Sequence, residues 1–505
     1  MILVRANTLP SFDVARPFAE RSSKDIYKDR KAWQHMPQLV ANQLAELRSG
    51  SYAWRHCPTE VTSQMSAKYT KSVYNISKRY ADGTMMLLNT ASEAVMVLDE
   101  SEADAFEALP ALIEDTSDLI DALISLGILV RADEDERFKF RVFRNRYAYA
   151  DDECVNVTIY PTQDCNARCF YCFEGGEERI TMSEDTADGV VEYLKNAITE
   201  DDEVIFRWFG GEPLMAADII DRILCGIDDA FEGRLTYHSI IITNASYIDD
   251  ALIEKFVGRW HVRKVQTTID GYQEKHNRRK CYVQDPHGSY EQVIRTIGKL
   301  LDAGIFTICR FNLDKNNIDD FPKVLDDLER FLTDSRFYVH ATTIRSNTSC
   351  GFTSTEDNIL PSDYPWFYER VLGELISRGF YKDPINVLPL RARNICLACS
   401  ASSYVINSEG KFYRCLQHSL GDDEATGDIH EGMRLNAAYA KWFEMTDNLP
   451  AGCETCVWLP CCQGGCKHYR MQGRPDALPC LRERFYIDVL LDVVWNQVTL
   501  RAVKS

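Results

Sequence analysis

The sequence lacks long apolar runs. No stretch reaches about 18 consecutive apolar residues, the length that indicates a membrane-spanning helix. The first residues, Met-Ile-Leu-Val-Arg-Ala, lack a basic segment followed by an apolar core, so no secretory signal is visible. We therefore expect a cytoplasmic protein without a membrane partner.

Positive charge is also scarce. The 505-residue chain has 57 Lys and Arg residues against 76 Asp and Glu residues, which gives a formal net charge of −19. Binding along nucleic-acid phosphates needs a basic surface, so we expect no nucleic-acid partner. The apolar content of 45% is typical of a globular protein, and the length allows about two to four domains.

Cysteine, in contrast, is abundant. The chain has 18 cysteines, and a reducing compartment disfavours disulfides, so clustered cysteines there indicate metal ligands. Two clusters are visible, one at 165–172 and one at 396–480. Most of the scattered cysteines are interpreted as small buried apolar residues.

Three cysteines follow a predicted strand at 154–160. Cys165, Cys169 and Cys172 have the spacing CxxxCxxC, which brings three thiolates to one short loop. Thiolates favour iron–sulfur clusters or zinc, and three ligands leave one position open, which is typical of a catalytic site. A zinc loop that borrows a distant fourth ligand is the alternative.

This loop, with Tyr171 just before its last cysteine, resembles the cluster loop of radical S-adenosylmethionine (SAM) enzymes. The resemblance implies that Cys165, Cys169 and Cys172 hold a catalytic 4Fe–4S cluster whose fourth iron is chelated by SAM. It also implies reductive cleavage of SAM to a 5′-deoxyadenosyl radical that abstracts a hydrogen atom. The electrons would come from an external flavodoxin or ferredoxin.

From about residue 151 the pattern alternates strands and helices, which predicts a parallel sheet covered by helices. The first helix is expected to open with the capping box Thr181-Met-Ser-Glu184. The α/β pattern is similar to the partial (β/α)6 barrel of radical SAM enzymes, in which the loops after the strands carry the chemistry. Strands are predicted at 154–160, 204–209, 238–243, 264–270, 305–312 and 336–343, and helices at 181–199, 216–230, 249–258, 289–303 and 318–333.

Glycine and polar residues follow several of these strands. Gly210-Gly211-Glu212-Pro213 comes directly after the second strand, and paired glycines allow close backbone approach to a ligand. The resemblance implies that this loop binds the amino group of SAM. An arginine paired with the SAM carboxylate is physically reasonable, and the sequence does not select which one. The further candidate cofactor-binding residues are Tyr171, Asn244, Asp270, Arg279, Arg310 and Asn312.

The last part of the chain carries a second cysteine pattern. It consists of CxxC at Cys396, Gly-x4-Cys ending at Cys415, Cys-x2-Cys-x5-Cys-x3-Cys from Cys453, and Cys480. This is similar to the SPASM extension of radical SAM enzymes, which holds two auxiliary 4Fe–4S clusters, and two zinc ribbons are the alternative. The resemblance implies one cluster on Cys396, Cys399, Cys415 and Cys466, and another on Cys453, Cys456, Cys462 and Cys480. Full cysteine ligation favours electron transfer, and Cys461 is interpreted as a buried thiol.

The residues before the barrel divide into two parts. Residues 1–68 show helical spacing between 22 and 49. Residues 69–150 contain a predicted three-stranded unit with two helices, followed by a charged connection at 131–150. This unit resembles winged-helix leader-recognition domains, in which a leader peptide adds as a strand to the sheet edge. The expected domains are 1–68 (helical segment), 69–150 (winged-helix-like domain), 151–385 (barrel) and 386–505 (cysteine-rich iron–sulfur domain).

SPASM enzymes act mostly on peptides or proteins. Sulfatase maturases carry an aspartate after the Gly-x4-Cys cysteine, whereas this sequence has Leu416. We therefore expect an oxidative maturase of a ribosomally synthesised precursor peptide with a leader, which joins a cysteine by a thioether to a carbon of another residue. The alternatives are carbon–carbon or carbon–oxygen crosslinking, formylglycine formation on a protein, and a non-catalytic iron–sulfur electron carrier.

Overall fold

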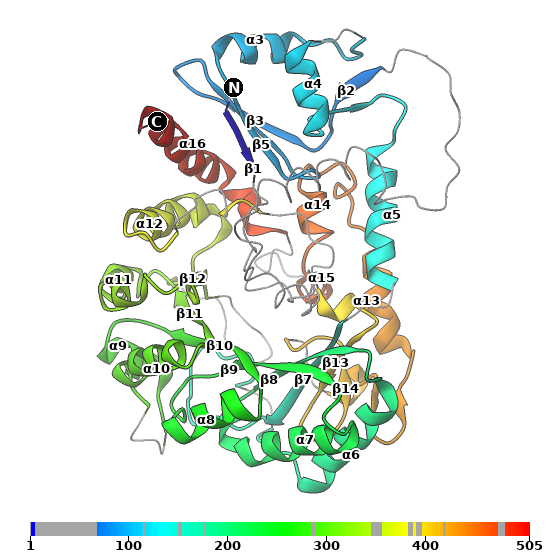
Figure 1. Cartoon of the computed structure of the whole chain (residues 1–505), viewed down its shortest axis with the longest axis vertical. Helices are drawn as coiled ribbons and strands as arrows, with labels where there is room; N and C mark the ends of the chain where they lie inside the picture. Colours follow the sequence, from blue (N-terminus) through cyan, green and yellow to red (C-terminus); the bar gives the residue numbers. More distant parts are fainter. Residues whose placement is uncertain are drawn as a thin grey trace.

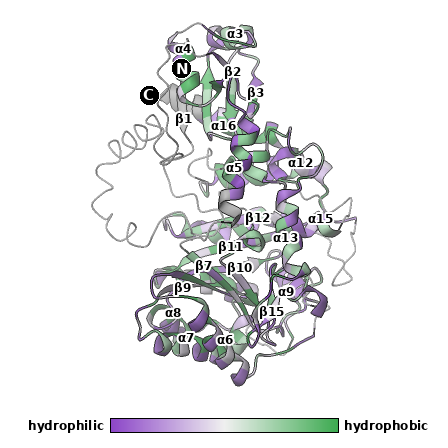
Figure 2. Ribbon diagram, turned by 90° about the vertical axis from the view of Figure 1, so that its right-hand side faces the viewer, coloured by the Kyte–Doolittle hydropathy of each residue, from purple (hydrophilic) through white to green (hydrophobic). Residues whose placement is uncertain are grey.

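The computed structural model describes residues 2–5, 68–114, 117–149, 154–175, 178–283, 288–344, 356–381, 387–389, 396–417, 421–472 and 480–504. The expected helices at 22–49 lie outside these residues. An N-terminal unit and a helix-covered sheet lie at opposite ends of the molecule, with C-terminal segments between them (Figure 1). Figure 2 shows the same order from the side. Within the described ranges, no helix is long and apolar enough to cross a membrane.

The central sheet has eight strands in the order β12-β11-β10-β9-β8-β7-β13-β14. Strands β7 to β12 pair in parallel, which confirms the predicted α/β class with a mostly parallel sheet. Their bounds are β7 Cys154–Thr162, β8 Glu203–Gly210, β9 Thr236–Ile242, β10 Val262–Ile269, β11 Phe306–Leu313 and β12 Phe337–Thr343, each within two residues of the prediction.

Two strands from the C-terminal region extend this sheet. β13 (Ser403–Ile406) runs parallel to β7, with Ser403 opposite Asn156, and β14 (Phe412–Tyr413) pairs antiparallel with β13. The sheet therefore contains strands from both sides of the domain boundary expected at residue 386.

Helices cover the outer face of the sheet (Figure 1). The outward residues of the strands, such as Val157, Phe206 and Ile241, are buried against them. The covering helices are α6 Glu184–Ala197, α7 Ala217–Ala230, α8 Asp250–Gly258, α9 Glu274–Lys280, α10 Tyr290–Asp302, α11 Phe321–Leu328 and α12 Tyr364–Ser377.

The first covering helix begins later than the capping box predicts. Ser183 is the N-cap of α6, and its hydroxyl accepts a hydrogen bond from the backbone N–H of Thr186 at 3.0 Å. Thr181 instead bridges to β7, where its hydroxyl lies 2.8 Å from that of Thr162. The prediction that Thr181 caps the helix is wrong because this residue is already used by the sheet.

The N-terminal unit contains a four-stranded antiparallel sheet in the order β1-β5-β4-β3. The strands are β1 Ile2–Arg5, β3 Asn75–Arg79, β4 Met85–Asn89 and β5 Ala94–Leu98, with helices α3 Glu100–Ala108 and α4 Asp118–Ser125. A second, two-stranded sheet joins β2 (Tyr69–Lys71) to β6 (Leu129–Arg131). The three expected strands are present as β3, β4 and β5, and Ile2–Arg5 adds a fourth that was not expected, with Ile2 opposite Val97.

Strand β4 is buried on both faces. Met85 and Leu87 pack towards α3 and α4, whereas Met86 and Leu88 pack into the core shared with α12 and α16 (Ile487–Lys504). This double burial explains the continuous apolar run at 85–88.

The predicted connection at 131–150 contains a helix, α5 (Glu136–Tyr149). Glu136 ties it to the N-terminal unit by accepting hydrogen bonds from the Ser72 hydroxyl at 2.7 Å and the Val73 N–H at 2.9 Å. Phe140 packs against Tyr74 and Leu459, so α5 joins this unit to the C-terminal segments.

Candidate active site

The loop at 163–175 follows β7 and carries the first three cysteines. Backbone hydrogen bonds join it to the segment after α9, from the Arg168 N–H to the Lys280 carbonyl at 2.9 Å and from the Val283 N–H to the Asn166 carbonyl at 2.7 Å. The buried Asn166 amide donates to the Ser246 hydroxyl at 2.8 Å. The loop is therefore fixed by segments that follow two other strands.

The three thiols of this loop are near one another. Burial raises the pKa of Cys165 and of Cys172 to about 12, and each is raised further by the charge of Cys169. Protonated thiols are not ligands, so cluster binding must release their protons.

Three thiols on one loop are a donor set that a 4Fe–4S cluster accepts. Among the described residues, no three His, Cys, Asp or Glu side chains converge as one metal ion requires. In a 4Fe–4S cluster each thiolate binds a different iron, so the thiolates need not converge on one point.

The two glycines after β8 allow the ends of β7 and β8 to meet. A Cβ on Gly210, at a φ of +117°, would lie 2.3 Å from the Thr162 carbonyl oxygen, and one on Gly211 would lie 2.0 Å from that of Asp164. The sequence predicted close approach to a ligand. The structure shows close approach to the backbone that leads into Cys165.

Glu212 is fully buried and its carboxylate is turned into the protein. Oε1 accepts from the Thr243 hydroxyl at 2.7 Å, and Oε2 accepts from the Asn244 N–H at 2.7 Å. Burial raises the pKa of Glu212 to about 7, although these hydrogen bonds act to lower it. Pro213 follows in the first turn of a short 3-10 helix. Glu212 thus ties the end of β8 to the end of β9, whose Asn244 amide lies 3.9 Å from the Cys165 sulfur.

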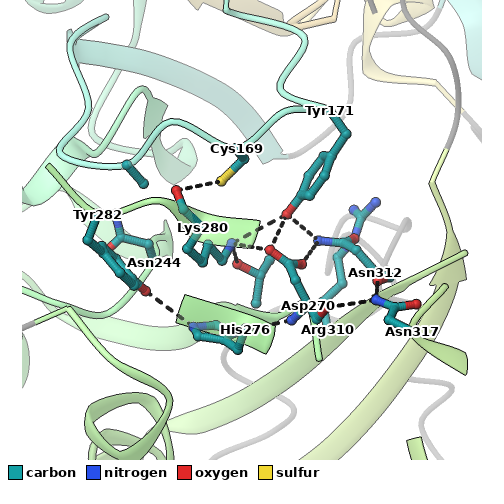
Figure 3. Close-up of polar contacts among 12 residues, drawn as sticks. Cys169, Tyr171, Asn244, Asp270, His276, Lys280, Tyr282, Arg310, Asn312 and Asn317 are labelled. Atoms are coloured by element: carbon teal, nitrogen blue, oxygen red, sulfur yellow. Dashed lines mark hydrogen bonds and ion pairs between the residues drawn. The ribbon is translucent and has the colours of Figure 1, made fainter. Parts of the chain in front are cut away.

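A second polar cluster lies at the ends of β10 and β11 (Figure 3). The Tyr171 hydroxyl donates to Asp270 Oδ2 at 2.6 Å, and the Asn312 amide donates to Asp270 Oδ1 at 2.9 Å and to the Tyr171 oxygen at 3.1 Å. The predicted residues Tyr171, Asp270 and Asn312 therefore meet directly, and they anchor the cysteine loop to the sheet.

Lys280 compensates the charge of this cluster. Its Nζ lies 3.2 Å from Asp270 Oδ2, and both side chains are buried. Although burial opposes ionisation, Lys280 helps to keep the pKa of Asp270 below its ordinary value. His276, also buried, accepts a hydrogen bond from the Asp270 N–H, and burial lowers its pKa to about 3. Neither Lys280 nor His276 is among the site residues that the sequence predicted.

The two candidate arginines already have protein partners. Arg279 forms an ion pair with Asp314 at 2.6 Å, and its guanidinium lies 4.7 Å from the ring centroid of Phe170 in the cysteine loop. The Arg310 Nε donates to Asn312 Oδ1 at 2.9 Å. Both lie beside the predicted cofactor position, and pairing of either with a SAM carboxylate stays a prediction.

The C-terminal cysteines form two groups. In the first, Cys396 and Cys399 share a hydrogen bond that raises the pKa of Cys396 and lowers that of Cys399, and the charge of Cys415 also acts on Cys396. Lys467, the residue after Cys466, lowers the pKa of both thiols. Cys466 itself lies directly before α15 (Lys467–Gln472).

The second group lies near the N-terminal unit. Burial and then the charges of Cys480 and Cys456 raise the pKa of Cys453, and burial raises that of Cys462 to about 11. Cys461, beside this group, is buried, and its thiol points to the carbonyl of Thr90 at 3.6 Å. The SPASM resemblance assigns these cysteines to two auxiliary clusters. Their ligand roles stay predictions.

The site is a cysteine loop at the carboxyl edge of a mostly parallel α/β sheet. Residues 159–328 match the profile of the radical SAM superfamily. The chain therefore contains a radical SAM domain, which implies SAM and a 4Fe–4S cluster as cofactors.

Curated relatives match parts of the chain. "Radical SAM cyclopropyl synthase TigE" from Paramaledivibacter caminithermalis is 21% identical over 223 residues, which is 41% of this chain and 46% of TigE. "Fe-coproporphyrin III synthase" from Methanosarcina barkeri is 23% identical over 183 residues, which is 36% of this chain and 42% of the synthase. The chain thus spans less than half the length of these relatives.

A solved structure shares the fold. It is "Native anSMEcpe with bound AdoMet and Cp18Cys peptide", with a TM-score of 0.52 and 16% identity, covering 70% of this chain and 99% of that chain. The match extends well beyond residues 159–328.

Proposed function

We propose that this protein is a radical SAM maturase that crosslinks a ribosomally synthesised peptide, with a cysteine thioether as the favoured product. The observation that carries the proposal is the cysteine loop, fixed at the carboxyl edge of the sheet beside Gly210 and Gly211. When bound, the cluster and SAM supply the electron and the deoxyadenosyl radical that abstracts hydrogen. The protein holds Cys165, Cys169 and Cys172 in place and orients the peptide.

The polar residues around the loop divide by what they do in the protein. Tyr171, Asp270 and Asn312 are hydrogen-bonded to one another, so their first contribution is to fix the loop on which the cluster would lie. Gly210 and Gly211 place the backbone of the β8 end against the loop, where the SAM amino group is expected. Arg279 and Arg310 are the candidates for the SAM carboxylate.

The C-terminal cysteine groups support an electron-transfer role. Two separate groups of thiols suit two auxiliary 4Fe–4S clusters, and a cluster with four cysteine ligands has no open iron for substrate. Thioether formation releases an electron beyond those used to cleave SAM, and an auxiliary cluster can accept it. A flavodoxin or ferredoxin would supply the electron that starts each cycle.

A peptide substrate is supported by the N-terminal unit. No other described strand pairs with the outer side of β3, where an extended leader could add as a further strand. The anSMEcpe structure holds a bound peptide, and this chain shares that fold. Leu416, the residue after Cys415, packs with Tyr160 and Val405 in an apolar cluster, which disfavours a formylglycine mechanism that needs a base there.

The direct test is anaerobic co-expression with a short cysteine-containing peptide encoded beside the gene. Loss of two hydrogens per site together with cysteines that resist alkylation would support thioether formation. The same loss with free cysteines would indicate a carbon–carbon or carbon–oxygen bond. Absence of 5′-deoxyadenosine in the reduced, reconstituted protein would contradict the enzyme proposal and favour an electron carrier.

A further inference from the structure

Arg414 joins two of the C-terminal cysteine segments. It directly precedes Cys415, and its buried guanidinium donates only to backbone carbonyls in the segment around Cys399. These carbonyls belong to Ser403 at 2.7 Å, Ala398 at 3.2 Å, Leu397 at 3.5 Å and Ser400. One side chain therefore holds the two segments that carry Cys396, Cys399 and Cys415.

The positive charge of Arg414 has no carboxylate partner among the described residues. Its guanidinium faces the ring of Tyr439 at 4.7 Å and that of Phe443 at 5.7 Å, both on α13 (Ala437–Asp447). Carbonyl hydrogen bonds satisfy the N–H groups but leave the net charge, and a buried charge without compensation is costly. Thiolates bound to iron would supply the missing negative charge beside it.

We propose that Arg414 is a positioning residue that also raises the reduction potential of the auxiliary cluster on Cys396, Cys399 and Cys415. The inference rests on the proposed auxiliary clusters. One-electron reduction adds a negative charge to a cluster, and a cation held nearby in a poorly polarisable interior stabilises that charge. The four carbonyl contacts keep the cation in place and the two cysteine segments together.

The test uses the full chain with Cys165, Cys169 and Cys172 replaced by alanine, so that any remaining signal comes from the auxiliary clusters. Arg414→Met removes both the positive charge and the guanidinium N–H donors. Arg414→Lys keeps the positive charge but not the planar guanidinium. Arg434→Met is the control, because Arg434 forms an exposed ion pair with Glu431 at 2.8 Å in the same region. Iron content and a dithionite titration followed by electron paramagnetic resonance are measured for each protein.

We expect the parent protein to hold about eight irons in two clusters. In Arg414→Met the midpoint reduction potential of one cluster should fall by ~59 mV, which is about a tenfold change in the equilibrium constant of a one-electron reduction. Arg414→Lys should keep the midpoint near that of the parent but lose iron faster, because an ammonium cannot span four carbonyls. Arg434→Met should change neither property.

Three outcomes would overturn the inference. Unchanged midpoints in an Arg414→Met protein with full iron content would show that the charge does not act on a cluster. A midpoint in Arg414→Lys as low as in Arg414→Met would show the same. A parent protein without auxiliary iron would contradict the cluster assignment itself, which the iron count separates from the role of Arg414. If Arg414→Met does not fold, Arg414→Gln, which also removes the charge, takes its place in the same comparison.

Discussion

The cations near the two kinds of cysteine site are compensated differently. At the CxxxCxxC loop, Lys280 pairs with Asp270 and Arg279 pairs with Asp314. At the C-terminal groups, Arg414 is bound only by backbone carbonyls, and Arg470 donates to the carbonyls of Met445 and Asn448. Carboxylates thus pair with Lys280 and Arg279, whereas in the described part of the chain no carboxylate pairs with Arg414 or Arg470.

This difference follows from what each site is proposed to hold. A three-thiolate cluster with SAM has one thiolate fewer and lies beside the positive sulfonium group of its ligand. Four thiolates on a cluster leave a net negative charge that the protein must balance. The same metal chemistry therefore requires opposite electrostatic surroundings in one chain.

The largest expected effect comes from removing the first site. Replacement of Cys165, Cys169 and Cys172 by alanine should abolish 5′-deoxyadenosine release and remove about four irons per chain. Cys225→Ala, on α7, is the control and should retain both. Release that persists in the triple variant would show that the radical chemistry lies elsewhere.

The next effect tests how the first site is held. Gly211→Ala should destabilise the protein by more than about 4 kcal/mol, because its Cβ would lie 2.0 Å from a backbone oxygen that cannot move freely. Gly373→Ala, within α12 and with open space around its Cβ, should be neutral or stabilising by about 0.5–1 kcal/mol. Urea unfolding of the cluster-free proteins measures both, and equal stabilities would contradict the close approach.

A third test breaks the carboxylate compensation. Lys280→Met should cost about 3–5 kcal/mol of unfolding free energy because it leaves buried Asp270 unpaired. Adding Asp270→Asn should recover part of that loss. Lys299→Met is the control, since its ion pair with Asp250 is exposed and should be worth at most about 1 kcal/mol. A double variant no more stable than Lys280→Met would argue against the charge explanation.

The smallest effect concerns acid stability of the barrel. Burial lowers the pKa of His238 to about 3, below its unfolded value of 6.5. As the pH falls, the unfolded chain therefore binds a proton at His238 before the folded chain does. The stability contributed by His238 is lost as the pH falls below about 6.5. His238→Gln should reduce the loss of stability between pH 7.5 and pH 5.5 by about 1.4 kcal/mol. The exposed His430→Gln should not change it.

The alternation of apolar strands and helices predicted the strands of the parallel sheet well, because each element depends on its own periodicity. The pairing of Ile2–Arg5 with β5 could not be predicted, since it joins residues some 90 positions apart. The helix α5 was missed because its charged sequence hides a narrow apolar side that includes Phe140.

The site residues that local spacing marks were predicted, whereas those defined by contacts between separate segments were not. Spacing alone located the cysteines, and the position after a strand located Asp270 and Asn312. Lys280, at the end of α9, meets Asp270, directly after β10, only because of the turn between the two elements. No local sequence pattern predicts that contact. Arg414 was overlooked because its partners are backbone carbonyls, which a sequence does not display.

The fourth strand of the N-terminal unit has a consequence for peptide capture. Because β1 occupies the β5 side, a peptide strand has two routes, which are the β3 edge or exchange with Ile2–Arg5. A covalently attached segment competes at an effective concentration on the order of mM. If the proposed leader binds at β5, exchange would therefore set an affinity threshold, because a weakly matching peptide would not displace Ile2–Arg5.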